Sequence, residues 1–574
     1  MKKHKKVKIS EEMPKYKYVV PYSICIFILI YPLIPDINIK EKMVILMAVF
    51  CLSWFIGENI FPDNIIKNNP LRDKNKTLWI MAAIFVICAV LSQVFSADYE
   101  NEFQNYNTDF ESLAVLLSYV VLFFISYNYF YMNKILDILK KTVVVLMTII
   151  IVMSIIEFFD IPIATLWIGN RENLESINRV KLTFDNSNYY GCFCCMLLPF
   201  AFEYWLHAKN RISCIAGILI NIGIVFCILV SKSTLVFYLQ IAIIIAMMIC
   251  EIKTIKCKIK EFIVLLIAMS VILLVVNGIS GGKLGALIEV SASNGDSFEE
   301  NVNDIYELKK IDLEGNKLTI YGNESKFSIV CDENIAFYDS DDNIMDAQNE
   351  DGWFVFKDEA YKNVKIEFSV IENASTVYMK IELGYKDTLD FYIINGEFKG
   401  VGADLVPLDS IGEEYTFHKF DNAFTGRGYM WIRTLPKLKD VILIGKGPGN
   451  YVYNYDQYDY VGLMKIHGTH KVIVNRPHNI ILQYCMDIGI LGTLALCGIV
   501  IYILVQCIIN RFKYRKNDNW ILQATFFSVI AFCIFSMLND SMVTVSPYMW
   551  ILLGINMSVQ YMANRSQKIV MQEK

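Results

Sequence analysis

Apolar runs of membrane length are the feature that most constrains this chain. A helix that crosses a bilayer needs about 20 mostly apolar residues. The 574 residues are 55% hydrophobic, with a mean hydropathy of +0.39, which is typical of a polytopic membrane protein. We therefore predict an all-α polytopic membrane bundle of about 12 transmembrane helices. The runs are residues 19–35, 43–61, 78–95, 113–131, 142–159, 189–206, 212–230, 233–250, 261–279, 479–507, 519–539 and 545–562.

The charges of the loops between these runs alternate. The N-terminal "MKKHKKVK" and every second loop are rich in Lys and Arg, whereas the loops between them are acidic or neutral. Cytoplasmic loops of membrane proteins carry an excess of Lys and Arg. The pattern predicts a multi-pass protein of the plasma membrane with both ends in the cytoplasm. The long segment 280–477 is then extracytoplasmic. The first run has no A-x-A cleavage site, so we interpret it as an uncleaved helix.

An acidic, strand-like insertion interrupts the bundle. Residues 281–420 contain about 29 acidic and about 12 basic side chains. Within 310–400, seven short stretches from "NKLTIYG" to "LDFYIING" alternate apolar and polar residues between turn signals. This pattern predicts an inserted extracytoplasmic β-sandwich. Its role stays open between a glycan-binding or partner-docking module and a spacer.

These boundaries predict four parts. They are an N-terminal transmembrane bundle of about nine helices, an inserted acidic β-rich domain, an extracytoplasmic catalytic loop and about three C-terminal transmembrane helices. Their ranges are residues 1–280, 281–420, 421–478 and 479–574.

His478 is the first candidate for chemistry. It follows Arg476-Pro477 where the chain enters the tenth apolar run. Proline fits the first turn of a helix, so we expect the helix to begin near Pro477. The positive end of the helix dipole would disfavour an imidazolium and keep His478 neutral. A neutral imidazole can act as a general base. The alternative is a histidine that caps an interfacial helix.

Several cations lie in or near the predicted external loops. Arginine offers a bidentate fork to a diphosphate, so such a cluster fits a pyrophosphate pocket. The alternative is that these side chains extend toward lipid headgroups. The cations are Arg171, Arg179, Lys232, Arg427, Arg433 and Arg476.

Other polar motifs favour structural roles. "GKGPGN", residues 445–450, matches neither phosphate-loop pattern and is better interpreted as a turn. His467 and His470 would face one metal only on a helix, and no third ligand is evident, so no metal is expected. Asp487 lies inside the tenth run, and we interpret it as a structural polar contact.

Four stretches, in this order, resemble the O-antigen ligase/polymerase superfamily of bacterial membrane glycosyltransferases. They are "RVKLTFDNSNYYGCFCCMLLPFAF", "VSKST", "TGRGYMW…LIGKGPGNY" and "RPHNIILQYCMDIGILG". The likeness covers about 180–500 without the insertion. It implies a GT-C-like membrane enzyme that transfers a glycan from a polyisoprenyl-diphosphate donor at the outer leaflet.

The resemblance also assigns roles, with no metal and no cofactor. His478 would be the general base on the acceptor hydroxyl, which belongs to a glycan or glycolipid. The diphosphate would be bound by Arg427, Lys232, Arg179 and Arg476, with support from Asn188, Asn479 and Trp431. Lys232 departs from the family's arginine and lacks its bidentate fork. Partners would be this donor, the acceptor and membrane lipid, with no nucleic acid.

Two other functional classes stay open at this point. A transporter or flippase of lipid-linked glycan would need ionisable residues at mid-membrane, or interrupted helices in paired halves. A membrane-anchored glycan-binding receptor would use the inserted β-domain and would leave the polar residues around His478 unexplained. The sequence does not distinguish a ligase from a polymerase.

Overall fold

The computed structural model describes residues 15–60, 75–97, 111–159, 161, 180–285, 305–371, 376–402, 405–412, 420–513 and 520–572. The chain divides into two compact units. Unit 1 comprises residues 1–91, 109–295 and 491–574, and unit 2 comprises residues 92–108 and 296–490.

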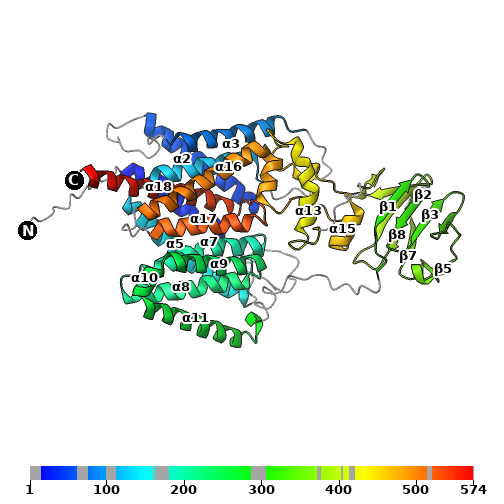
Figure 1. Cartoon of the computed structure of the whole chain (residues 1–574), viewed down its shortest axis with the longest axis horizontal. Helices are drawn as coiled ribbons and strands as arrows, with labels where there is room; N and C mark the ends of the chain where they lie inside the picture. The colour runs from blue at the N-terminus through cyan, green and yellow to red at the C-terminus, as the bar shows by residue number, and fades with distance from the viewer. Residues whose placement is uncertain are drawn as a thin grey trace, which may run out of the picture. The chain divides into compact units, whose positions relative to one another are not determined.

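Unit 1 is helical, and each of the twelve predicted apolar runs coincides with a helix (Figure 1). The helices that contribute residues to it are α1 (Val19–Ile30), α2 (Ile37–Ile60), α3 (Lys76–Val94), α4 (Leu113–Tyr129), α5 (Asn133–Phe158), α7 (Ser187–Leu206), α8 (Arg211–Val230), α9 (Thr234–Cys250), α10 (Ile252–Cys257), α11 (Ile259–Ile279), α16 (Ile480–Lys513), α17 (Trp520–Ser536) and α18 (Ser546–Gln572).

Six helices in the described part of the chain are long and apolar enough to cross a membrane. Three shorter helices, α4, α9 and α17, are also apolar. These helices make the chain a multi-pass membrane protein, whereas the number of twelve spans stays a prediction. The six are Tyr16–Leu33, Lys76–Val94, Asn133–Phe158, Arg211–Val230, Ile259–Ile279 and Ile480–Asn510.

Small residues allow the helices of unit 1 to approach closely. Helix α7 packs against α8, where a Cβ on Gly217 would lie 2.8 Å from Trp205. Helix α18 packs against α4, where a Cβ on Gly554 would lie 2.3 Å from the carbonyl oxygen of Phe123. Close backbone approach at small residues is a main source of helix association in lipid, where apolar surface alone gives no preference.

Unit 2 contains a separate antiparallel β-domain, as predicted. A four-stranded sheet has the order β1-β2-β3-β4, and a seven-stranded sheet has the order β11-β10-β9-β8-β7-β6-β5. The strands are β1 (Lys310–Glu314), β2 (Lys317–Tyr321), β3 (Lys326–Cys331), β4 (Ile335–Tyr338), β5 (Ala347–Glu350), β6 (Trp353–Phe356), β7 (Lys365–Val370), β8 (Thr376–Glu382), β9 (Leu389–Ile394), β10 (Glu397–Val401) and β11 (Pro407–Leu408).

The seven predicted stretches contain β2, β3, β4, β6, β7, β8 and β9, but the count of seven is wrong because β1, β5, β10 and β11 were missed. The two sheets share one core, to which Phe327 and Ile329 of the first sheet and Met379 and Phe391 of the second contribute. The limits 281–420 and 421–478 of the predicted parts stay predictions.

Helix α15 (Tyr460–His467) completes the core of the β-domain. Tyr460 and Met464 belong to the same buried cluster as the strand residues. The Val401 N–H donates to the Tyr460 hydroxyl at 2.7 Å, and this hydroxyl donates to the Val401 carbonyl at 2.8 Å. The segment that follows the insertion is therefore bonded directly to β10, which lies next to the edge strand β11 of the larger sheet.

Helix α16 is interrupted near its start. Gly489 has φ 86° and ψ 160°, which no helix contains, and the Ile490 N–H donates to the Val441 carbonyl at 2.9 Å instead of to a helical partner. A Cβ on Gly489 would lie 2.9 Å from the Leu443 carbonyl carbon. The break therefore requires glycine for its positive φ and for the close approach of a second backbone.

The predicted turn, residues 445–450, supplies the hydrogen bonds that the break removes. The Lys446 N–H donates to the Met486 carbonyl at 2.6 Å, and the Gly447 N–H donates to the Asp487 carbonyl at 3.0 Å. Buried backbone groups without partners cost free energy, above all in a membrane protein. We call residues 445–450 the glycine loop. It serves as a backbone support for α16.

This arrangement predicts that Gly489→Ala destabilises the protein by about 1–3 kcal/mol, because alanine is strained at this φ and meets the Leu443 backbone. Gly57→Ala in α2 is the matched control, because its Cβ has nothing within 4 Å. Thermal unfolding of the purified full chain measures both variants. Equal unfolding temperatures for the two variants would contradict this account of the break.

Candidate functional site

The segment Arg476–Asn479, which we call the histidine corner, immediately precedes α16. The N–H groups of Ile481 and Leu482 donate to the Asn479 side-chain oxygen at 2.9 and 3.1 Å. Asn479 is therefore the N-cap of α16, and it satisfies two donors that the helix cannot pair itself. The expected helix start near Pro477 was three residues too early, because the cap and not the proline begins the helix.

His478 stands in an unusual backbone conformation. Its φ is +49°, and its side chain is partly buried. Non-glycine residues in this region cost about 1–3 kcal/mol and gather at functional sites, although histidine is among the types that tolerate it. His478 therefore lies outside the helix, two residues before α16 begins, whereas the sequence predicted it at the helix start.

Trp431 joins the histidine corner to a second element. It lies on α13 (Arg427–Thr434), and its indole Nε1–H donates to the Pro477 carbonyl at 2.9 Å. The ring of Trp431 also packs against Phe424, with centroids 5.2 Å apart. The expected supporting residue therefore bonds the peptide group that leads directly into His478.

Arg427 is the first residue of α13 and is partly buried. Its Nη1 donates to the Thr425 hydroxyl at 2.8 Å and to the Phe424 carbonyl at 3.2 Å. Residues four apart lie on one face of a helix, so Arg427 shares the face of Trp431. Since Trp431 bonds Pro477, the helix that begins with Arg427 is bonded to the histidine corner.

Arg433 has a structural role. It is fully buried, with Nε 2.7 Å from Asp459, Nη1 3.1 Å from Asp421, and its guanidinium 3.7 Å from the Tyr429 ring centroid. Such a paired charge is strongly destabilising to break. Arg433 therefore links α13 to Asp459, which caps the start of α15, and its charge is already paired within the protein.

Arg476, the other cation of the histidine corner, is partly buried and directly precedes Pro477. Arg476 thus precedes His478 by two residues in the same segment. Helix α13 contributes Arg427 as a second candidate cation. These two residues are the expected diphosphate ligands that lie within unit 2.

His467 is a neighbour of His478 that the sequence analysis did not connect with it. Burial, and the positive charge that His478 can carry, lower the pKa of His467. Its ring meets Tyr429 edge-on at 6.2 Å. The neutral form of His467 is therefore favoured beside the histidine corner. Periodicity could not have found it, because its position depends on how α15 packs on α13.

The remaining expected site residues belong to unit 1. Val230–Thr234, which we call the lysine turn, holds Lys232 at φ +51°. The Val180 N–H donates to the Val230 carbonyl at 3.1 Å, which joins the turn to the segment before α7. Asn188 lies in the first turn of α7, and its N–H donates to the side chain of Asn186 at 2.8 Å.

Two of the four resemblance stretches thus meet within unit 1, and the other two meet within unit 2. Arg179 and Arg171 lie outside the described residues. Non-glycine residues with positive φ also recur in all four stretches or directly beside them. They are Leu182, Lys232, Phe424, Thr425 and His478.

Lys40 is a buried cation that the sequence analysis missed. It is 0% exposed, its Nζ donates to the Thr183 carbonyl at 3.0 Å, and it lies 4.8 Å from the Phe184 ring centroid. Glu157 accepts from the N–H groups of Lys181 and Leu182 on the same segment. A cation and a carboxylate from two helices therefore fix the turn that leads into α7.

Asp487 has the structural role expected of it. Its carboxylate accepts from the Gly449 N–H at 3.3 Å, and its carbonyl accepts from the Gly447 N–H. The glycine loop is a turn, as predicted, and its N–H groups at these two positions bond α16.

The two candidate metal ligands have different surroundings. Helix α15 ends at His467, and Gly468 follows at φ 68°, so His470 lies beyond the helix. His470 stacks on Tyr460 at 4.4 Å and is buried in the β-domain. Among the described residues, no group of three or more His, Cys, Asp or Glu side chains is placed to hold a metal.

The decisive comparison concerns the segment that contains α13, α15, the glycine loop and the histidine corner. Residues 374–497 match the family described as O-Antigen ligase. The resemblance to the O-antigen ligase superfamily is confirmed. We call 374–497 the O-antigen ligase region. A search of the curated proteins found no match. The match indicates a membrane protein that processes glycans in the manner of a ligase or polymerase.

His470 gives the β-domain a measurable pH dependence. Burial lowers its pKa to about 4, although the Asp390 carboxylate opposes this change. Since the unfolded chain has a pKa of about 6.5, it binds the proton first as pH falls. Stability that is complete above pH 6.5 should therefore be lost between about pH 6.5 and about 4.

His470→Phe, which keeps an aromatic ring against Tyr460, should lack this part of the pH dependence. Thermal unfolding of the two full chains between pH 7.5 and 4 measures the difference, because the carboxylates contribute alike to both. Parallel curves would show that His470 is not held neutral.

Proposed function

We propose that this chain is a membrane glycosyltransferase that transfers or polymerises a polyisoprenyl-diphosphate-linked glycan at the external membrane face. The proposal rests on one observation above all. The Trp431–Pro477 hydrogen bond couples α13, which carries Arg427, to the histidine corner, which carries Arg476 and His478. This contact joins the two segments that carry a candidate base and two candidate cations, and both segments lie inside the O-antigen ligase region.

The chemistry needs these two kinds of group. His478 would accept the proton of the acceptor hydroxyl while the hydroxyl oxygen forms a bond to the anomeric carbon of the donor. The bond between that carbon and the diphosphate oxygen breaks, and the polyisoprenyl diphosphate leaves with its electron pair. Arg427 and Arg476 would stabilise the developing negative charge. The imidazolium then gives its proton to solvent or to the departing diphosphate.

Lys232, Asn188 and Arg179 are the expected contribution of the first two resemblance stretches. Lys232 would supply a point charge to the diphosphate, with weaker geometric selection than an arginine fork. Its positive φ, like that of His478, supports a functional reason for the strained turn. The reaction would need no metal ion, as the resemblance implies.

A transporter or flippase of lipid-linked glycan is the second candidate, and the break in α16 favours it. Interrupted helices in transporters expose unwound backbone to a substrate or ion. Here the carbonyls of Met486 and Asp487 accept from the glycine loop, so these groups are already used within the protein. We therefore favour the transferase. A receptor role for the β-domain has no specific observation in its support.

Replacing His478 is expected to abolish transfer. General bases contribute about 10²–10⁴-fold to rate, and neither His478→Ala nor His478→Gln retains a proton acceptor of suitable pKa. Surface-glycan profiling in cells that express each variant measures the effect. A ligase defect should leave lipid-linked glycan unattached, and a polymerase defect should leave single repeat units. An unchanged profile in a well-expressed variant, or rescue by Gln, would exclude the role of base.

Trp431→Phe tests the contact that carries the proposal. Phenylalanine keeps the ring beside Phe424 but cannot donate to Pro477. We expect an unfolding free energy within about 1 kcal/mol of the unmodified protein, but a kcat roughly 10-fold lower, because the imidazole is less well oriented. Phe424→Leu, which changes packing but leaves the hydrogen bond, is the control. Equal activities of Trp431→Phe and the unmodified enzyme would show that the contact does not position His478.

A further inference from the structure

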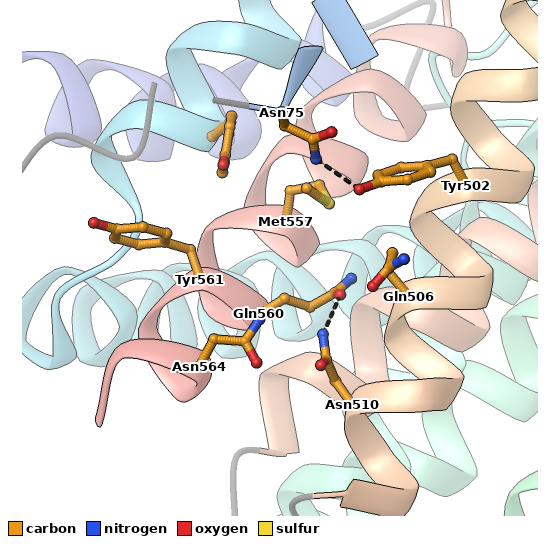
Figure 2. A pocket seen from close by; sticks show the side chains of 9 residues that line it. Asn75, Tyr502, Gln506, Asn510, Met557, Gln560, Tyr561 and Asn564 are labelled. Atoms are coloured by element: carbon orange, nitrogen blue, oxygen red, sulfur yellow. Dashed lines mark hydrogen bonds between the residues drawn. The ribbon is translucent and has the colours of Figure 1, made fainter. Parts of the chain in front are cut away.

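Unit 1 contains a polar cavity that the proposed reaction does not use. Its volume is about 300 Å³, and it lies between α16 and α18 beside the start of α3 and the end of α4 (Figure 2). Five carboxamide side chains line it, and Figure 2 shows two of them on α16, two on α18 and one directly before α3. They are Asn75, Gln506, Asn510, Gln560 and Asn564.

Two hydrogen bonds between side chains orient part of this lining before any ligand binds. The Asn75 side chain donates to the Tyr502 hydroxyl at 2.9 Å, and the Asn510 side chain donates to Gln560 at 2.8 Å (Figure 2). Gln560 donates in turn to Asn556 at 2.6 Å. A site whose polar groups are already oriented loses less entropy when it binds a ligand.

Part of the polar capacity of this lining remains for a ligand. Each carboxamide offers two N–H donors and an acceptor oxygen, so the bonds of Asn75 and Asn510 leave further donors and acceptors, whereas both N–H donors of Gln560 already bond Asn556 and the Ile503 carbonyl. In the described part of the chain, Gln506 and Asn564 make no hydrogen bond to another side chain, and both line the cavity. The volume corresponds to roughly ten water molecules at about 30 Å³ each, so it exceeds a packing defect.

The lining selects the class of ligand. It consists of carboxamides, the phenols of Tyr127, Tyr502 and Tyr561, and one methionine. None of these side chains is charged near neutral pH. Within the described lining, a charged ligand would meet no counter-charge, which is costly. A polyhydroxylated ligand matches the lining, because hydroxyls donate and accept like carboxamides and the rings of tyrosines cover apolar C–H faces.

We propose that this cavity binds a neutral saccharide, either as a free sugar or as the headgroup of a glycolipid. On the predicted topology, the cavity opens at the cytoplasmic end of the bundle, because Asn75 and Asn510 adjoin the basic second and tenth loops. The site is independent of the proposed transfer reaction. A polar network that only holds helices together is the alternative.

The test uses the purified full chain in phosphatidylcholine nanodiscs, because glycoside detergents would compete for the site. Saturation-transfer difference NMR is recorded with glucose and N-acetylglucosamine as neutral probes and with glucose 6-phosphate as the charged counterpart. A second arm adds a monoglucosyl lipid to the nanodiscs. Displacement of the free sugar by this lipid identifies a glycolipid headgroup as the better source, and no displacement identifies the free sugar.

Variants assign the signal to the cavity. Gln506→Leu removes a lining carboxamide with little change of volume, and Gln523→Leu makes the same change at a partly buried site on α17 outside the cavity. We expect Gln506→Leu to weaken binding of a neutral sugar about 10-fold and Gln523→Leu to leave it unchanged. If Gln506→Leu does not fold, Tyr502→Phe, which removes one hydroxyl, takes its place.

The outcomes separate this proposal from the transferase. His478→Ala should keep the saturable signal, because it does not alter the cavity. Absence of saturable binding for both neutral sugars, or equal binding by Gln506→Leu and Gln523→Leu, would overturn the saccharide site whatever the catalytic result. Equal binding of glucose 6-phosphate would overturn the selection for neutral ligands.

Discussion

The backbone groups around the break in α16 need hydrogen-bond partners, and this need determines how the neighbouring segments of unit 2 are arranged. Gly489 ends the regular hydrogen-bond pattern, and the three backbone bonds across the break connect Met486, Asp487 and Ile490 with the segment 441–447. In a membrane protein such groups cannot rely on water. The loop that pairs them is therefore fixed against the first turns of α16. The start of α16 itself is set by the Asn479 cap, which directly follows His478.

Two of the residues that the proposed chemistry needs have a strained backbone. His478 and Lys232 both have positive φ, at +49° and +51°. Each stands within two residues of a backbone carbonyl that accepts a hydrogen bond. Pro477 accepts from Trp431, and Val230 in the lysine turn accepts from Val180. Strained residues persist only where the surroundings determine them, and a group positioned in this way is pre-organised for catalysis.

The sequence predicted what depends on local pattern. Apolar length located the twelve helices, and period-two alternation located seven strands. The strand β5, "AQNE", was missed because it has no alternating apolar face, and β11 has only two residues. The cap at Asn479 displaced the expected helix start by three residues. Each of these errors arises where hydrophobic periodicity is absent or too short, or where a side-chain hydrogen bond ends the pattern.

The sequence selects the candidate site residues by type but does not predict their contacts. Motif order proposes His478, Arg427 and Trp431, whereas the Trp431–Pro477 bond joins residues 46 positions apart and depends on tertiary packing. The same holds for Arg433, because no spacing rule predicts its ion pairs with Asp421 and Asp459. Lys40 was hidden for a similar reason, because its partner Thr183 is 143 residues away.

The central claim is tested most directly by reconstituting the purified chain with a polyisoprenyl-diphosphate-linked saccharide and a glycan acceptor in the presence of EDTA. The measurement is the amount of free polyisoprenyl diphosphate released and of acceptor glycan extended, by mass spectrometry. The account predicts that both products form in equal amounts with the unmodified chain and that neither forms with His478→Ala. Transfer by His478→Ala at the unmodified rate, or intact donor with the unmodified chain, would contradict it.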